Sequence, residues 1–148
     1  MKKFRYSMEN ILRIKLRLED QAKLSYARAR NRLTVEEDKL QNLEDKKSHY
    51  EQEQREQINC KLNIKKMRQL SEAIDIMKQK IENQKVAVKT AAQNLEIARV
   101  RLNNAMIERK AQERLKEKAW QDYLSEVNAQ EQKEIDERNS FNYNGLLL

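Results

Sequence analysis

The chain has 148 residues, of which 37% are charged and 5% are aromatic, with one glycine and no proline. Compact globular domains need turn residues at short intervals, so this composition excludes an ordinary globular fold. A mean hydropathy of −1.05 also suits disorder, and only a helical period among the apolar residues separates a stable helical protein from an unfolded one.

Residues 3–57 show a rough 3-4 apolar spacing, which predicts a first long helix over about this range. Lys15, Glu36 and Lys47 interrupt the spacing. The apolar positions that follow it are Phe4, Met8, Ile11, Leu18, Ala22, Tyr26, Ala29, Leu33, Leu40, Leu43 and Tyr50.

The apolar period lapses after Gln52, and residues 58–63 have no clear helical phase, so we predict a turn there. Asn63 is a suitable N-cap for a second helix that begins at Ile64. Cys60 lies in the predicted turn as a free thiol. A single cysteine excludes an intramolecular disulfide and agrees with a reducing cytoplasm.

The second helix, predicted over about 64–138, carries a strict 3-4 repeat from residue 67 to residue 102, in which ten of eleven positions are apolar. Such a repeat is typical of a coiled-coil seam, and a short turn makes the two helices antiparallel neighbours. The prediction is therefore an all-α, two-helix antiparallel coiled-coil hairpin over residues 1–139. Its predicted core consists of Ile11, Leu18, Tyr26, Leu33, Leu40, Leu43, Leu70, Ile74, Ile81, Val88, Leu95 and Leu102.

Pairing the helices about residue 61 sets Tyr50 near Leu70 and Leu33 near Val88, and it places the start of the first helix beside residues 111–118. Residues past Trp120 then overhang as helix without a partner, and residues 140–148 form a flexible tail. The overhang is either a frayed tail or a docking segment. Exposed Trp120, Tyr123, Leu124 and Val127 favour docking.

Charge is distributed unevenly along the chain. Residues 1–32 contain ten Lys/Arg and three Asp/Glu, a net charge of +7, whereas residues 119–138 contain six acids and two bases. A basic amphipathic start suits nucleic acid or an anionic membrane, but no nucleic-acid-binding module or long basic stripe accompanies it. We therefore expect no nucleic-acid partner.

No chemical site is evident. His49 is the only histidine and reads as an ordinary surface residue; with one cysteine, no zinc ligand set exists. Phosphate-binding glycine loops and catalytic triads are missing as well, so we expect no enzyme activity, cofactor, metal or small-molecule ligand. The N-terminus lacks the apolar core of a signal peptide, and no apolar run reaches membrane-spanning length.

Two stretches resemble the FliJ family of bacterial flagellar export proteins. "KKFRYSMENILRIKLRLEDQAKLSYARAR" (residues 2–30) is similar to the aromatic-basic-aromatic opening of that family, and "ERKAQERLKEKAWQDYLSEVNAQEQKEIDE" (residues 108–137) to its closing motif. The positions that match the closing motif are Glu108, Arg109, Lys110, Leu115, Lys116, Tyr123, Glu131, Gln132, Lys133, Ile135, Asp136 and Glu137.

The resemblance implies a hairpin stalk that inserts into the hexameric flagellar export ATPase, promotes its activity and connects it to the membrane export gate. It also implies a cytoplasmic protein, peripheral at the membrane and monomeric on its own, that serves motility and can bind export chaperones. Candidate contacts with the ATPase ring are Arg13, Arg17, Lys23, Arg109, Lys110, Arg114, Lys116, Trp120 and Tyr123. Candidate gate contacts, most of which are also seam positions, are Leu43, Tyr50, Leu70, Ile74 and Met77.

Two alternatives remain open at this stage. The first is a coiled-coil chaperone or adaptor that binds export cargo without any ATPase role, which a large apolar groove would favour. The second is the basic coiled-coil arm of a nucleic-acid-associated protein, which steeply salt-dependent binding to DNA or RNA would support.

Overall fold

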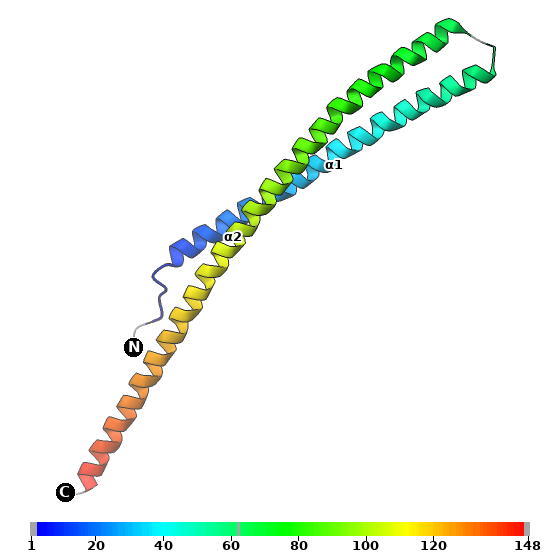
Figure 1. Ribbon diagram of the computed structural model, residues 1–148. Helices are drawn as coiled ribbons and strands as arrows, with labels where there is room; N and C mark the ends of the chain where they lie inside the picture. The colour runs from blue at the N-terminus through cyan, green and yellow to red at the C-terminus, as the bar shows by residue number, and fades with distance from the viewer. Residues whose placement is uncertain (1–2, 62, 147–148) are drawn as a thin grey trace. The chain divides into compact units, whose positions relative to one another are not determined.

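The computed structural model describes residues 3–61 and 63–146 and contains two helices, α1 (Glu9–Asn59) and α2 (Ile64–Leu146). They pack against each other as a helical hairpin, which confirms the predicted all-α fold (Figure 1). Within the described ranges, neither helix holds a stretch that is long and apolar enough to cross a membrane.

Helix α1 begins at Glu9, six residues later than predicted. A turn closed by the backbone hydrogen bond from Glu9 N to Tyr6 O, 3.2 Å, precedes it, and Met8 O accepts the first helical bond from Leu12 N, 3.1 Å. The Glu9 carboxylate lies in the first turn, where it complements the positive end of the helix dipole. Residues 3–8 therefore form a separate non-helical segment.

Asn63 is the N-cap of α2, as predicted. Its side-chain Oδ1 accepts a hydrogen bond from Lys66 N, 3.3 Å, and its carbonyl accepts one from Met67 N, 3.0 Å. Helix α2 then continues through Leu146, past the predicted end at residue 138 and through most of the predicted tail. Residues 1–2 and 147–148, and Leu62 of the predicted turn, lie outside the described residues.

The described chain divides into two compact units: a terminal unit (Met1–Asp20 with Asn104–Leu148) and a turn unit (Gln21–Asn103). In the turn unit, α1 and α2 run side by side into the short connection (Figure 1). All eleven positions of the predicted 67–102 seam are buried or half-buried. Its most buried apolar side chains are Leu70, Ile74, Met77, Ile81, Ala91 and Ala98.

The seam of the turn unit also contains polar residues that face each other across the helices. Gln84 Nε2 donates to the Glu36 carbonyl at 2.9 Å and to Glu36 Oε2 at 2.5 Å. Arg32 and Lys39 pair with the same carboxylate at 2.9 and 3.8 Å. Glu36 and Gln84, which break the apolar pattern in the sequence, are thus partners in the predicted register.

The predicted seam phase is wrong at the start of α1. Ile11 and Leu18 are 39% and 43% exposed, whereas the adjacent Leu12 and Glu19 are 5% and 4% exposed. The 3-4 spacing that leads back from Ala22 passes through Glu19, Lys15 and Leu12, all buried or half-buried. Burial of Glu19 is tolerated because a cation on α2 pairs with it, as described below.

A candidate partner-binding site in the terminal unit

Ion pairs between the helices cross the seam of the terminal unit, in addition to the buried Leu12. Arg109 takes a seam position on α2, where its Nε donates to Glu19 Oε2 of α1 at 2.6 Å and its Nη1 donates to Glu113 Oε2 at 2.8 Å. The hydrogen bond that Arg109 donates to Glu19, followed by the one that it donates to Glu113, raises the pKa of Arg109 above its ordinary value. This guanidinium therefore holds α1 and α2 together.

Further contacts repeat this arrangement toward the N-terminus. Lys15 of α1 pairs with Glu108 of α2 at 2.9 Å, and Lys116 of α2 pairs with Glu9 of α1 at 3.0 Å. The Tyr6 hydroxyl donates to Gln112 Oε1 at 3.3 Å. The start of α1 thus lies beside residues 112–116, in the predicted register. A helix as polar as 108–118 stays paired through charges and hydrogen bonds.

An aromatic cluster formed by Phe4, Trp120 and Tyr123 follows the polar seam. The Phe4 ring meets Trp120 edge to face, with centroids 5.0 Å apart and planes at 74°. Tyr123 lies 5.4 Å from Phe4 and stacks on Trp120 at 5.6 Å. The expectation that Trp120 and Tyr123 lie beyond any partner is therefore wrong.

The register of the ion pairs accounts for this contact. Glu9 pairs with Lys116 in antiparallel helices, so Phe4, which precedes Glu9 by five residues, lies beside Trp120 and Tyr123. From residue 128 to residue 145, by contrast, every side chain of α2 is exposed, so the unpaired part begins after Val127.

The structure separates the nine candidate ring contacts into two groups. Arg109 and Lys116 are engaged in interhelical ion pairs, and Trp120 and Tyr123 in the aromatic cluster. Arg13, Arg17, Lys23, Lys110 and Arg114 are exposed. Among residues 3–61 and 63–146, four of these have no ion-pair partner: Arg13, Arg17, Lys110 and Arg114.

Arg5 was not singled out from the sequence, yet it is also exposed and lines the same surface pocket of the terminal unit as Arg13. The pairing of Glu9 and Glu19 with α2 was missed as well. Its only sequence signal is the complementary placing of acids on α1 and bases on α2 at seam positions.

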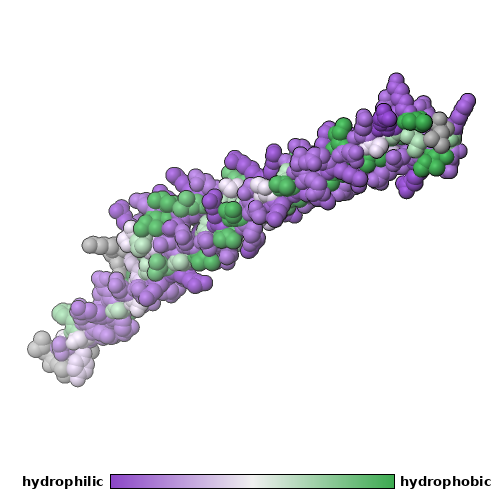
Figure 2. Space-filling model, turned by 45° about the horizontal axis from the view of Figure 1, so that its top comes forward, coloured by the Kyte–Doolittle hydropathy of each residue, from purple (hydrophilic) through white to green (hydrophobic). Residues whose placement is uncertain are grey.

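On the face drawn in Figure 2, hydrophilic side chains predominate and hydrophobic ones form separate patches.

The candidate gate contacts lie in the turn unit. Leu70, Ile74 and Met77 are buried, whereas Leu43 and Tyr50 are half-buried. Tyr50 and His49 border a surface hollow together with Met77 and Lys80, and His49 also contacts Glu53 at 3.0 Å.

Within the described residues, no three His, Cys, Asp or Glu side chains are grouped as a metal site would require. Cys60 is an exposed free thiol.

Comparisons with known proteins agree with this architecture. The family profile described as "Flagellar FliJ protein" matches residues 4–145. A solved structure described as that of a YscO homologue, CT670, from Chlamydia trachomatis is similar, with a TM-score of 0.68 and 27% sequence identity over 94% of each chain. No curated protein matches the sequence significantly. Because the profile spans nearly the whole chain, from the aromatic cluster at Phe4 to the exposed end of α2, the chain belongs to the FliJ family of flagellar proteins.

Proposed function

We propose that this protein is a non-catalytic stalk of the flagellar type III export apparatus. Its terminal unit enters the ring of the hexameric export ATPase and promotes ATPase activity, and its turn unit connects the ring to the membrane export gate. The family match and the YscO-like neighbour support the broader role of an export component. In this proposal the protein works at the cytoplasmic face of the membrane.

The stalk role is supported by two separate groups of residues in the terminal unit, one that joins the helices and one that is exposed. The interhelical ion pairs of Arg109 and Lys116 and the ring contact of Phe4 hold this unit together. Arg13, Arg17, Lys110 and Arg114 remain exposed on its outer surface. A stalk that touches several ring subunits needs such a surface, because exposed charges steer association and fix register without a large apolar interface.

The proposal is tested by mixing the protein with the cognate export ATPase and following phosphate release. We expect stimulation by the wild-type chain and by a truncation after Gln130, which keeps the Phe4–Trp120–Tyr123 cluster. Reversal of Lys110 and Arg114 to Glu should reduce stimulation while leaving helicity intact, since neither side chain bridges the helices. If the wild-type chain leaves phosphate release unchanged, it is not an ATPase stalk.

A contact with the export gate forms the other half of the proposal. Leu70, Ile74 and Met77 are core residues, so the accessible candidates are the half-buried Leu43 and Tyr50, of which Tyr50 borders the hollow that it shares with His49. We expect Tyr50→Ala to weaken gate binding in a pull-down while the melting curve changes little. Equal loss of gate binding and stability would assign Tyr50 to packing alone.

A groove along α2 favours a second candidate function, that of an adaptor for export chaperones. Phe4, Ala119, Tyr123 and Val127 line a hollow of about 740 Å³ together with Lys3, Arg5, Glu126 and Gln130. An amphipathic helix can place an apolar residue in such a groove. Chaperone binding that persists when the ATPase is left unstimulated would favour this function over the stalk.

A further inference from the structure

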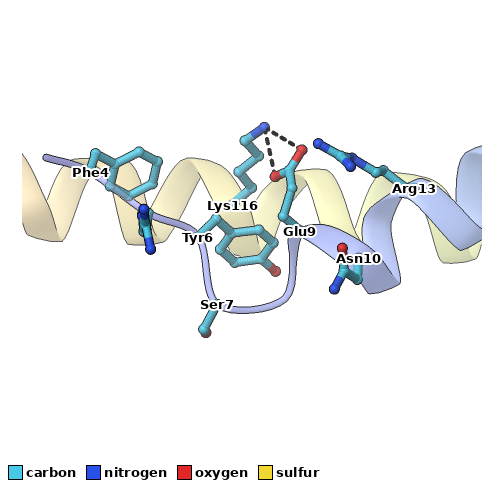
Figure 3. A pocket seen from close by; sticks show the side chains of 8 residues that line it. Phe4, Tyr6, Ser7, Glu9, Asn10, Arg13 and Lys116 are labelled. Atoms are coloured by element: carbon cyan, nitrogen blue, oxygen red, sulfur yellow. Dashed lines mark hydrogen bonds and ion pairs between the residues drawn. The ribbon is translucent and has the colours of Figure 1, made fainter.

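A second pocket of the terminal unit lies at the start of α1, on the surface that the stalk proposal assigns to the ATPase ring. Phe4, Arg5, Tyr6, Glu9, Arg13 and Lys116 contribute to its walls, and its volume is about 660 Å³ (Figure 3). The non-helical segment 3–8 supplies the first three of these side chains, and the first two turns of α1 supply Glu9 and Arg13.

The charge of this pocket follows from its internal ion pair. Lys116 Nζ lies 3.0 and 3.3 Å from the two carboxylate oxygens of Glu9, so these opposite charges offset each other. Arg5 and Arg13 remain, both exposed and, among the residues that the structure describes, without an ion-pair partner. The pocket therefore presents two guanidinium groups beside two aromatic side chains.

This combination has a definite chemical preference. A guanidinium presents donors in a planar fork that matches a carboxylate, and aromatic walls accept the methylene stem of a glutamate. Nucleic acid needs a longer basic stripe than two arginines provide. Acidic peptide segments fit the pocket best.

We infer that the Arg5–Arg13 pocket receives carboxylate side chains from an acidic segment of a partner protein. The assignment of that partner to the ATPase ring rests on the proposed function, whereas the binding chemistry stands on the pocket itself. Arg109 and Lys116, which the sequence offered as ring contacts, then position the two helices, and Arg5 and Arg13 make the contact.

The fluorescence of Trp120 can report whether this pocket is occupied. Phe4 both lines the pocket and packs on Trp120, which is the only tryptophan in the chain. An occupant that moves Phe4 changes the surroundings of the indole ring. Trp120 fluorescence can therefore follow binding to the full chain without a label.

The test is a titration of the full chain with a short oligoglutamate peptide at low ionic strength, with oligoglutamine and a single-stranded oligonucleotide as comparisons. We expect a saturable change of Trp120 fluorescence with oligoglutamate alone. The variant Arg5→Glu with Arg13→Glu should bind at least about tenfold more weakly, because both charge-assisted contacts are lost. The matched control is Arg28→Glu with Arg30→Glu, which alters net charge equally at exposed positions outside the pocket and should bind like wild type.

Equal weakening in both double variants would show attraction to overall charge and overturn the pocket, as would tighter binding of the oligonucleotide or no response to oligoglutamate. The ATPase assay separates this inference from the proposed function. Stimulation by wild type but equally by Arg5→Glu/Arg13→Glu would remove the pocket from the ring contact and leave the stalk intact. Site-specific peptide binding without ATPase stimulation would keep the pocket and reject the stalk.

Discussion

Arg109 of α2 lies 2.6 Å from the buried carboxylate of Glu19 on α1, at a position where a coiled coil ordinarily places an apolar residue. The guanidinium also holds Glu113 one turn further along α2, at 2.8 Å. One cation thus bridges the helices and neutralises an acid that could not be buried alone. In the terminal unit such pairs join the helices beside the buried Leu12, whereas most buried seam residues of the turn unit are apolar.

The first prediction concerns this bridge. Arg109→Glu would place a third carboxylate against Glu19 and Glu113, and the repulsion should lower the melting temperature and helicity of the chain. Lys110→Glu changes the same charge at the neighbouring exposed position and should leave the melting curve nearly unchanged. The double variant Glu19→Arg with Arg109→Glu should recover part of the loss. Circular dichroism measures all three, and identical melting of the two single variants would contradict the bridge.

A second prediction concerns pH. The hydrogen bond from Gln84 holds the pKa of Glu36 below its ordinary value, and Lys39 and Arg32 act in the same direction against desolvation. A lowered folded-state pKa means that the ionised carboxylate stabilises the fold above the ordinary pKa of 4.5, and that this stabilisation is lost as the pH falls through the folded value.

We therefore expect Glu36→Gln to reduce the melting temperature at pH 7 and to lose less stability than wild type when the pH is lowered below about 4.5. Melting curves at a series of pH values measure this difference. Parallel curves for the two proteins would show that Glu36 does not contribute to acid sensitivity.

A third prediction tests the apolar seam with two isoleucines of α2. Ile81 is 6% exposed and Ile76 is 54% exposed. Ile81→Asp buries a charge among apolar side chains and should cost roughly 3 kcal/mol or more, with a sharp loss of helicity. Ile76→Asp makes the same chemical change on the outer face and should alter stability little. Similar melting of both variants would refute the seam phase.

The fourth prediction concerns the aromatic cluster, and the two phenylalanines of the chain provide the comparison. Phe4→Ala removes two ring contacts, worth about 1–3 kcal/mol together, and should release segment 3–8 from α2. Trp120 emission should shift to longer wavelength while the helical signal changes little. Phe141→Ala removes a highly exposed ring and should leave the emission unchanged. Unchanged emission in Phe4→Ala would mean that the cluster does not form in solution.

The sequence by itself determined the hairpin, its turn and the seam of the turn unit. From Met67 to Leu102 the apolar side chains repeat every three or four residues, and in helices this period places them on one face that must be buried. Asn63 marked the start of α2 because an amide oxygen can satisfy the free backbone N–H groups of a first turn. These signals are local, so they can be read along the chain.

Only the tertiary structure decided the terminal unit. The sequence prediction assigned seam positions to apolar residues, because a charge is costly to bury without a partner. It therefore placed Ile11 and Leu18 in the seam. Glu19 is buried there instead, since Arg109, ninety positions away in the sequence, supplies that partner. Likewise, Trp120 has a neighbour because segment 3–8 continues along α2 past Glu9 and brings Phe4 to it. Pairing between distant residues changes which positions can be buried, and the helical period of the sequence does not show which residues pair.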